Sequence, residues 1–355
     1  MYLQNLRLYG FRNYEDRFFP FSQEMNCIVG KNGSGKTNLL DAIYFLALSK
    51  SSLHNQDQLS IRFGEDFCVV EGAFQTDRTE VVACHLPRQG KKTVTADGKA
   101  YEKLSDHIGK YPVVLIAPND TDLIRDGAET RRKLFDGILS QLYPDYLQTY
   151  LRYNKALDQR NSLLKQFGEQ HFFDEALLKI YSEQLLESGQ VIFETRKRFI
   201  EDFIPFFTAH YAELSENGEE VGLNYTSDAA ETGFEQRFYA QQEKDLVAQR
   251  TTLGVHKDDY EFLMSGMPVK KFGSQGQRKS YIMALKLAQF DSIHREKGVK
   301  PILLLDDIFD KLDDRRIDRL IGMVRAGAFG QVFITDARAE RTEELLGEGV
   351  NFIRL

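Results

Sequence analysis

The chain has 355 residues, of which 28% are charged and 42% hydrophobic, and its formal net charge is −7. This length allows about two domains, and the composition is that of an ordinary globular protein. The acidic balance excludes a surface that is basic throughout, but it allows a local basic patch.

No apolar run approaches the ~20 residues of a membrane-spanning helix, and the first residues lack the basic and apolar regions of a signal peptide. The three cysteines, Cys27, Cys68 and Cys84, lie in apolar runs without the spacing of a zinc site. We therefore expect buried free thiols in a cytoplasmic protein that binds no membrane.

The first third of the chain is rich in strand patterns. Asp97-Gly98 separates two short alternating runs, a strong signal for a two-residue hairpin. The expected strands cover residues 3–8, 27–29, 67–74, 81–86, 93–96, 99–101 and 113–117.

The segment between the strand at 27–29 and the next helix fills every fixed position of the phosphate-binding pattern G-x4-G-K-[ST]. Leu39, Ile43 and Leu46 follow at helical spacing, so the motif lies between a strand and a helix, where its backbone N–H groups and the helix dipole can meet phosphate. Lys36 is expected to reach the β- and γ-phosphates, and Thr37 to bind Mg²⁺. The predicted nucleotide contacts here are Gly30, Lys31, Asn32, Gly33, Ser34, Gly35, Lys36, Thr37 and Asn38.

From about residue 128 to 212 the chain becomes rich in Leu, Gln, Glu, Lys and Arg with helical spacing. Asp174 is a plausible N-cap for an apolar face that includes Leu178 and Val191. Pro144, Gly168 and Pro205 interrupt the pattern, which predicts several helices rather than a long coiled coil. Residues 215–235 are expected to form a loop or an edge strand.

Strand and helix patterns alternate again after residue 250. They predict a hairpin about Ser265-Gly266, a helix from Ser274 to Arg295, and strands at 301–305 and 331–335. The apolar strand at 301–305 ends in Asp306 and Asp307, as a Walker-B element requires. Asp306 is expected to hold Mg²⁺, and Asp307 to polarise an attacking water. Lys36 and Asp306 are 270 residues apart, which suits an ATPase head built from both chain ends.

The helix at 274–295 begins with Ser274, Gln275, Gly276 and Gln277, which resemble the signature motif of ABC-type ATPases. In those proteins this motif receives the γ-phosphate of ATP bound to a second subunit, and Asp313 resembles their D-loop residue at the dimer seam. Asn119-Asp120 stands where a Q-loop glutamine is expected, and Thr335-Asp336 where a switch histidine is expected.

The motifs together resemble the RecF family, bacterial ATPases related to SMC and Rad50 heads. The resemblance rests on Gly10 to Tyr14, the phosphate loop, Gly254 to Asp259, the signature and the Walker-B run. It implies ATP and Mg²⁺ as cofactors and an ATP-dependent homodimer that closes on duplex DNA near gaps or junctions of double and single strands. It further implies action with RecO and RecR in loading RecA, and weak, DNA-dependent ATP hydrolysis that releases the DNA.

The expected DNA contacts are local groups of cations that touch the duplex backbone. The best group is Arg131, Arg132 and Lys133, and the next includes Lys91 and Lys92. His256 has no companion with metal-ligand spacing, so we interpret it as structural. Asp258 and Asp259 are interpreted as polar anchors of the same turn.

We expect an α/β fold, an ABC-type P-loop ATPase head with a short SMC-like arm. Lobe I, a mixed sheet with helices, is expected to comprise residues 1–119 and 251–355, and the helical lobe II residues 120–250. Two alternatives stay open: an SMC- or Rad50-like head acting with a nuclease, which should carry a long coiled coil, and the ATPase subunit of a membrane transporter, which should carry a switch histidine.

Overall fold

The computed structural model describes residues 1–170, 173–215, 218–309, 314–347 and 349–355. It forms two compact units, one of residues 1–120 and 282–355 and the other of residues 121–281. The predicted insert ended at residue 250, whereas the second unit continues to residue 281. The difference arises because the strand at 259–264 pairs with the strand at 221–226, inside the second unit.

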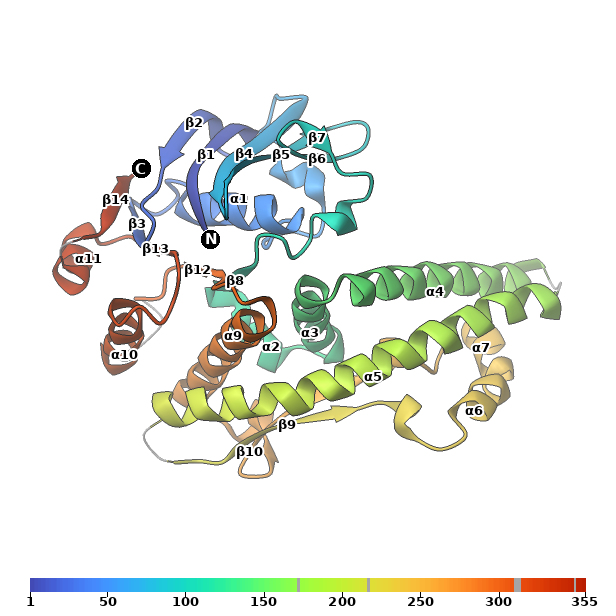
Figure 1. Cartoon of the computed structure of the whole chain (residues 1–355). Coiled ribbons are helices and arrows are strands. Elements are labelled where there is room, and N and C mark those ends of the chain that lie inside the picture. Colours follow the sequence, from blue (N-terminus) through green and yellow to red (C-terminus); the bar gives the residue numbers. More distant parts are fainter. Residues whose placement is uncertain (171–172, 216–217, 310–313, 348) are drawn as a thin grey trace. The chain divides into compact units, whose positions relative to one another are not determined.

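The first unit contains two sheets and a helix that packs against both (Figure 1). An antiparallel sheet has the order β2-β1-β4-β5-β6-β7, and a parallel sheet has the order β14-β3-β13-β12-β8. The strands are β1 (Tyr2–Phe11), β2 (Tyr14–Pro20), β3 (Met25–Val29), β4 (Phe67–Gln75), β5 (Thr79–Pro87), β6 (Thr93–Ala96), β7 (Lys99–Ala100), β8 (Val113–Ile116), β12 (Ile302–Leu305), β13 (Val332–Asp336) and β14 (Asn351–Arg354).

Helix α1 (Lys36–Leu48) buries ten of its thirteen residues. It contacts β1, β4 and β5 of one sheet and β8 and β13 of the other, so the apolar side chains of both sheets form one core. The parallel strands β3, β12 and β13 are buried at every position, which explains why β12 is entirely apolar and β3 and β13 are largely so. Within its described residues, this unit also contains the α-helices α10 (Asp314–Arg325) and α11 (Ala339–Leu346).

Gln331 joins the two sheets of the first unit. Its side-chain Oε1 accepts a hydrogen bond from the Leu3 N–H at 2.7 Å, and its Nε2 donates to the Leu3 carbonyl, also at 2.7 Å. Gln331 is almost completely buried, and its Nε2 also donates to the Ser22 carbonyl at 2.7 Å, so its amide is satisfied. Strand β1, at the beginning of the chain, is thereby attached to the residue directly before β13.

The strand predictions for this unit are confirmed, including the hairpin about Asp97-Gly98, whose residues both have positive φ. The three cysteines are buried free thiols, as expected. Burial raises the pKa of each of them to about 12, which keeps these thiols protonated.

The second unit is mainly helical and contains a long antiparallel helix pair, α4 and α5 (Figure 1). Its elements are α2 (Asp122–Arg125), α3 (Ala128–Leu142), α4 (Pro144–Gln170), α5 (Glu175–Leu214), β9 (Val221–Thr226), α6 (Phe234–Ala240), α7 (Gln242–Ala248), β10 (Asp259–Met264), β11 (Met267–Pro268) and α8 (Val269–Phe272). Helix α9 (Gln275–Lys297) begins in this unit and continues into the first.

Gly168 and Pro205 were expected to break the helices, and this prediction is wrong. Gly168 lies inside α4 and Pro205 inside α5. Phe203 and Phe207, on either side of the proline, are fully buried, and this packing outweighs the low helix propensity of proline. The N-cap prediction is confirmed, because the Asp174 carboxylate accepts a hydrogen bond from the Leu177 N–H at 2.9 Å.

The buried face of α5 also differs from the prediction at one position. Val191 is 44% exposed, whereas Ile192 is buried. Buried positions recur at three- and four-residue intervals, as in the seam of a short coiled coil: Leu178, Ser182, Leu185, Gly189, Ile192, Arg196, Phe199 and Phe203. The pair α4–α5 is therefore a short helical arm.

A three-stranded antiparallel sheet of order β11-β10-β9 completes the second unit. The hairpin about Ser265-Gly266 is confirmed, and β9 is the edge strand that was one expectation for residues 215–235. No helix within the described ranges is both long and apolar enough to cross a membrane.

Candidate nucleotide-binding site

The predicted phosphate loop connects the carboxyl end of β3 with the first turn of α1. Lys36, the first residue of α1, is only 8% exposed. Its Nζ donates hydrogen bonds to the carbonyl oxygens of Gly30 at 2.7 Å and Lys31 at 3.1 Å. The loop is thus folded around an ammonium group, the arrangement that receives phosphate oxygens at the start of a helix.

Gly35 holds a conformation that other residues rarely adopt, with φ of 110°. A Cβ at this position would lie 2.5 Å from Asn13 Nδ2 and 2.8 Å from the Tyr14 hydroxyl, so only glycine fits. The Tyr14 hydroxyl donates to the Gly35 carbonyl at 3.0 Å, and Asn13 Nδ2 donates to the Ser34 carbonyl at 3.2 Å. Two residues of the N-terminal segment therefore brace the phosphate loop.

Arg12, from the same segment, binds the helix that follows the loop. It has φ of 53°, and its Nη2 donates to the Asp41 carboxylate at 2.6 Å and to Ser51 Oγ at 2.8 Å. Asn38 Nδ2 donates to Asn13 Oδ1 at 2.7 Å. Sequence reasoning identified this segment by resemblance but assigned its residues no part in the site; nothing in their spacing indicates these contacts.

Asp306 follows β12 directly, at the carboxyl edge of the parallel sheet. Thr37 Oγ1 lies 3.1 Å from each oxygen of the Asp306 carboxylate, although the two residues are 269 positions apart. Burial raises the pKa of Asp306 above its ordinary value. The structure therefore brings the two predicted metal ligands together.

The chemistry of these two groups suits Mg²⁺. A hydroxyl and a carboxylate supply hard oxygen ligands, and Mg²⁺ is commonly held by one or two protein groups together with waters and phosphates. No group of three or more His, Cys, Asp or Glu side chains in the described ranges is arranged to hold a metal without such help. The donor set thus fits a metal that arrives with a nucleotide.

Asp307 also has an unusual backbone. Its φ is 50°, and its N–H donates to Thr335 Oγ1 at 2.8 Å. The same Thr335 oxygen donates to Asp306 Oδ1 at 2.8 Å. Thr335 is the residue found where a switch histidine was sought, and sequence reasoning did not include it in the site.

The signature segment lies in the second unit, at the start of α9. The Gln277 N–H donates to Ser274 Oγ at 3.2 Å, and the Ser274 N–H donates to Gln277 Oε1 at 2.7 Å. This is a capping box, and the Ser-x-x-Gln pattern could have predicted it. Ser274 and Gln275 are exposed, so the capped end of the helix faces solvent.

Two further predicted motifs follow β8 and β12. Asp120 accepts a hydrogen bond from the Ala117 N–H at 2.7 Å and pairs with Lys286 of α9 at 2.7 Å. Both contacts lie in the first unit, and they give the segment after β8 an ion pair where a Q-loop glutamine was sought. The predicted D-loop residue, Asp313, lies outside the described residues.

The cations proposed to contact DNA divide into two groups. Arg131 forms a bidentate pair with Asp259, Arg132 donates to the Asp258 carbonyl at 2.5 Å, and Lys92 pairs with Asp57 at 2.5 Å. Carboxylates therefore offset the charges of Arg131 and Lys92, whereas Arg132 is held by a neutral carbonyl. Lys91 and Lys133 are exposed, and Lys133 pairs with its helix neighbour Glu129.

The segment from Gly254 to Asp259 is structural, as the sequence indicated. The His256 ring lies between the Tyr153 hydroxyl and the Thr251 carbonyl. Asp258 pairs with buried Arg196 at 2.8 Å. All of these groups belong to the second unit.

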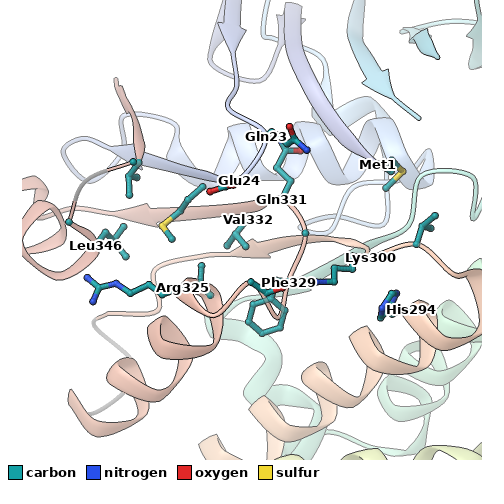
Figure 2. Close-up of a pocket in the computed structure, with 18 of the residues that line it drawn as sticks. Met1, Gln23, Glu24, His294, Lys300, Arg325, Phe329, Gln331, Val332 and Leu346 are labelled. Carbon is teal, nitrogen blue, oxygen red and sulfur yellow. Dashed lines mark hydrogen bonds between the residues drawn. The ribbon is translucent and has the colours of Figure 1, made fainter. Parts of the chain in front are cut away.

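A separate pocket of about 810 Å³ lies at the amino ends of β3, β12 and β13, at the sheet edge opposite the phosphate loop (Figure 2). Its lining includes Phe329, Val332, Lys300 and Arg325. The two cations donate to the carbonyls of Gly327 and Leu345, respectively. No residue of the phosphate loop or Walker-B element borders it, so it is distinct from the nucleotide site.

Comparison with known proteins agrees with this geometry. The model of the RecF/RecN/SMC N-terminal domain family matches residues 2–348. The chain is 47% identical over 347 residues to the DNA replication and repair protein RecF of Flavobacterium johnsoniae. The matched region covers 98% of this chain and 97% of that relative. The chain belongs to the RecF family. The RecF of Cytophaga hutchinsonii is 43% identical, over 96% of this chain and 91% of its own.

Solved structures support the same assignment. A structure of the recombination mediator protein RecF with ATP, from the RecFOR pathway, superposes with a TM-score of 0.88 at 28% identity, over 95% of this chain and 92% of that one. An SMC head domain superposes with a TM-score of 0.55 at 18% identity, over 98% and 91%, which shows a shared fold only. The fold of this RecF family member is thus that of an SMC-like ABC ATPase head.

Proposed function

We propose that this protein is an ATP-switched DNA-binding protein of replication and recombinational repair. The observation that carries the proposal is the contact between Thr37 and Asp306, which brings the phosphate loop and the Walker-B carboxylate to one edge of the sheet. The relatives named DNA replication and repair protein RecF and the ATP-bound RecF structure support it.

ATP is proposed to bind at the phosphate loop, with its β- and γ-phosphates replacing the Gly30 and Lys31 carbonyls as partners of Lys36 Nζ. Thr37 and Asp306 would hold Mg²⁺, which neutralises phosphate charge and polarises the phosphoryl group. Asp307 would accept a proton from the attacking water. Hydrolysis is proposed to be slow, DNA-dependent and a means of releasing DNA.

We further propose that ATP joins two copies of the chain. The capping box leaves Ser274 and Gln275 exposed at the start of a long helix, where the first N–H groups and the helix dipole favour an anion. In this proposal Ser274, Gln275, Gly276 and Gln277 receive the γ-phosphate of ATP held by the other copy, and Asp313 lies at the seam.

The homodimer is proposed to close on double-stranded DNA near gaps or junctions with single strands. Lys91 and Lys133 are the exposed cations among those named for phosphate contact. The RecFOR pathway named for the solved RecF structure supports RecO and RecR as partners in loading RecA, and the cytoplasm as the location.

Binding of labelled DNA tests this proposal. Affinity for a gapped duplex should be measured with ATP, with ADP and without nucleotide, and compared with affinity for a single strand of the same length. We expect ATP to raise affinity for the duplex substrate at least tenfold, and Lys36→Met to remove that increase. Equal affinity in all three nucleotide states would contradict the proposal.

A further inference from the structure

Thr335, at the end of β13, has a hydroxyl that contacts both Walker-B residues. It donates a hydrogen bond to Asp306 Oδ1 at 2.8 Å and accepts one from the Asp307 N–H at 2.8 Å. Thr335 is completely buried, so no water competes for this hydroxyl. A threonine hydroxyl has one donor hydrogen and two acceptor lone pairs. Here the single Thr335 oxygen links the two consecutive residues that follow β12, Asp306 and Asp307.

The pairing of the strands explains this placement. β12 and β13 are parallel neighbours, with Leu305 opposite Ile334. Asp306, the residue that follows β12, therefore lies beside Thr335, the next-to-last residue of β13. The register thus places the threonine beside the carboxylate.

The hydrogen bond to Thr335 also bears on the backbone of Asp307, which has an unusual conformation. Its φ of 50° lies in the left-handed region, which is unfavourable for a residue other than glycine and persists only where neighbouring groups hold it. The hydrogen bond from the Asp307 N–H to Thr335 Oγ1 is such a restraint. It fixes the peptide from which the Asp307 side chain projects.

Two hydroxyls converge on the Asp306 carboxylate, from Thr37 and from Thr335. Thr37 is also a proposed Mg²⁺ ligand, and a hydroxyl that binds a metal does so through its oxygen lone pair. Thr335 has no proposed bond to the metal, so its hydroxyl can donate to the Asp306 carboxylate whether or not a nucleotide is bound. Partners of this kind around a metal ligand commonly change metal affinity by 10–100-fold.

We propose that Thr335 is a positioning residue that orients Asp306 toward Mg²⁺ and holds Asp307 in its left-handed conformation. The inference rests on the proposed nucleotide site and deepens it.

The test compares Thr335→Val, which keeps the shape but removes the hydroxyl, with Thr335→Ser, which keeps the hydroxyl. Thr342→Val is the matched control, because Thr342 is also buried. Its hydroxyl donates to Asp336, the residue that follows Thr335, and does not contact Asp306 or Asp307. Affinity for a non-hydrolysable ATP analogue is measured with Mg²⁺ and with EDTA, together with turnover and melting temperature.

For Thr335→Val we expect at least a tenfold loss of analogue affinity with Mg²⁺, little change with EDTA, and a larger loss of turnover than of affinity. Thr335→Ser should restore most of both. If Thr335→Val fails to fold, Thr335→Ala replaces it in the same comparison.

The proposal is overturned if Thr335→Val keeps wild-type affinity with Mg²⁺ and turnover, if it loses affinity equally with EDTA, or if Thr335→Ser behaves like Thr335→Val. A purely structural threonine would lower the melting temperature to the same extent as Thr342→Val and leave the effect of Mg²⁺ unchanged. Failure of the wild-type chain to bind the analogue would instead contradict the proposed nucleotide site.

Discussion

The Tyr153 hydroxyl and the His256 ring form a hydrogen bond of 2.8 Å inside the second unit. His256 Nε2 lies 3.1 Å from the Thr251 carbonyl, which can only accept, so Nε2 carries the proton and Nδ1 accepts from Tyr153. Gly254 must be glycine for this contact, because it has φ of 134° and a Cβ would lie 2.8 Å from the Tyr153 oxygen. The neutral imidazole is therefore a structural link between α4 and the segment after α7.

This arrangement predicts a loss of stability in weak acid. Burial lowers the pKa of His256 from 6.5 to about 4, so between these values the unfolded chain binds more protons than the folded one. The free energy of unfolding should fall as pH drops through this window, by about 3 kcal/mol at its lower end. Urea unfolding at pH 7 and pH 4.5 measures it. His256→Gln should reduce the pH dependence, and His85→Gln, at an exposed position, should not.

Lys36→Met removes the ammonium group around which the phosphate loop folds. We expect ATP affinity to fall at least a hundredfold, because the phosphates lose their principal positive charge. Calorimetric titration with a non-hydrolysable analogue measures this change. Lys99→Met, on an exposed strand far along the chain from the loop, should bind normally; tight binding by Lys36→Met would rule out the assigned role.

Asp307→Asn keeps the size of the side chain but removes the carboxylate that is proposed to accept a proton from water. Turnover should fall by about a hundredfold or more while ATP affinity stays within a few fold. The ATP-bound dimer should consequently persist longer, which single-turnover hydrolysis and dimer lifetime can both measure. Unchanged turnover would eliminate Asp307 as the base, and Asp77→Asn, on an exposed turn, serves as the control.

Arg196→Met tests the buried ion network of the second unit. The guanidinium donates to both oxygens of Asp136 at 3.0 Å and pairs with Asp258 at 2.8 Å, and all three residues are buried. Its removal leaves two buried carboxylates without their cation, which should cost about 3–5 kcal/mol of unfolding free energy. Equilibrium urea unfolding should show this loss, whereas Arg198→Met, on the exposed face of α5, should show almost none.

The sequence predicted the parts of the site that local pattern determines. The phosphate loop, the Walker-B carboxylates and the signature segment at the start of α9 each follow from a few adjacent residues whose chemistry requires that spacing. Thr37 and Asp306 were each predicted to bind Mg²⁺, and the structure brings their side chains within hydrogen-bond distance of each other. Each of these motifs was predicted from residues that are adjacent in the sequence and lie in one strand or one turn.

The remaining features depend on partners far along the chain. Asn13 and Tyr14 brace Gly35, and Thr335 holds Asp306 and Asp307, through contacts that no local spacing encodes. Arg131 and Lys92 look like free cations in sequence, yet Asp259 and Asp57 neutralise them. Pro205 remains inside α5 because the aromatic packing around it outweighs its low propensity for helix.

Solution mass measured by sedimentation tests the central claim most directly. The chain is examined without nucleotide, with ADP, and with ATP and Mg²⁺, alongside Ser274→Arg and Ser274→Thr. We predict a dimer only with ATP, retained by Ser274→Thr, whose hydroxyl can still cap α9. Ser274→Arg should bind ATP with nearly normal affinity yet remain monomeric. A wild-type chain of the same mass in all three nucleotide states, or a normal ATP-dependent dimer of Ser274→Arg, would contradict an ATP-driven dimer joined through the signature.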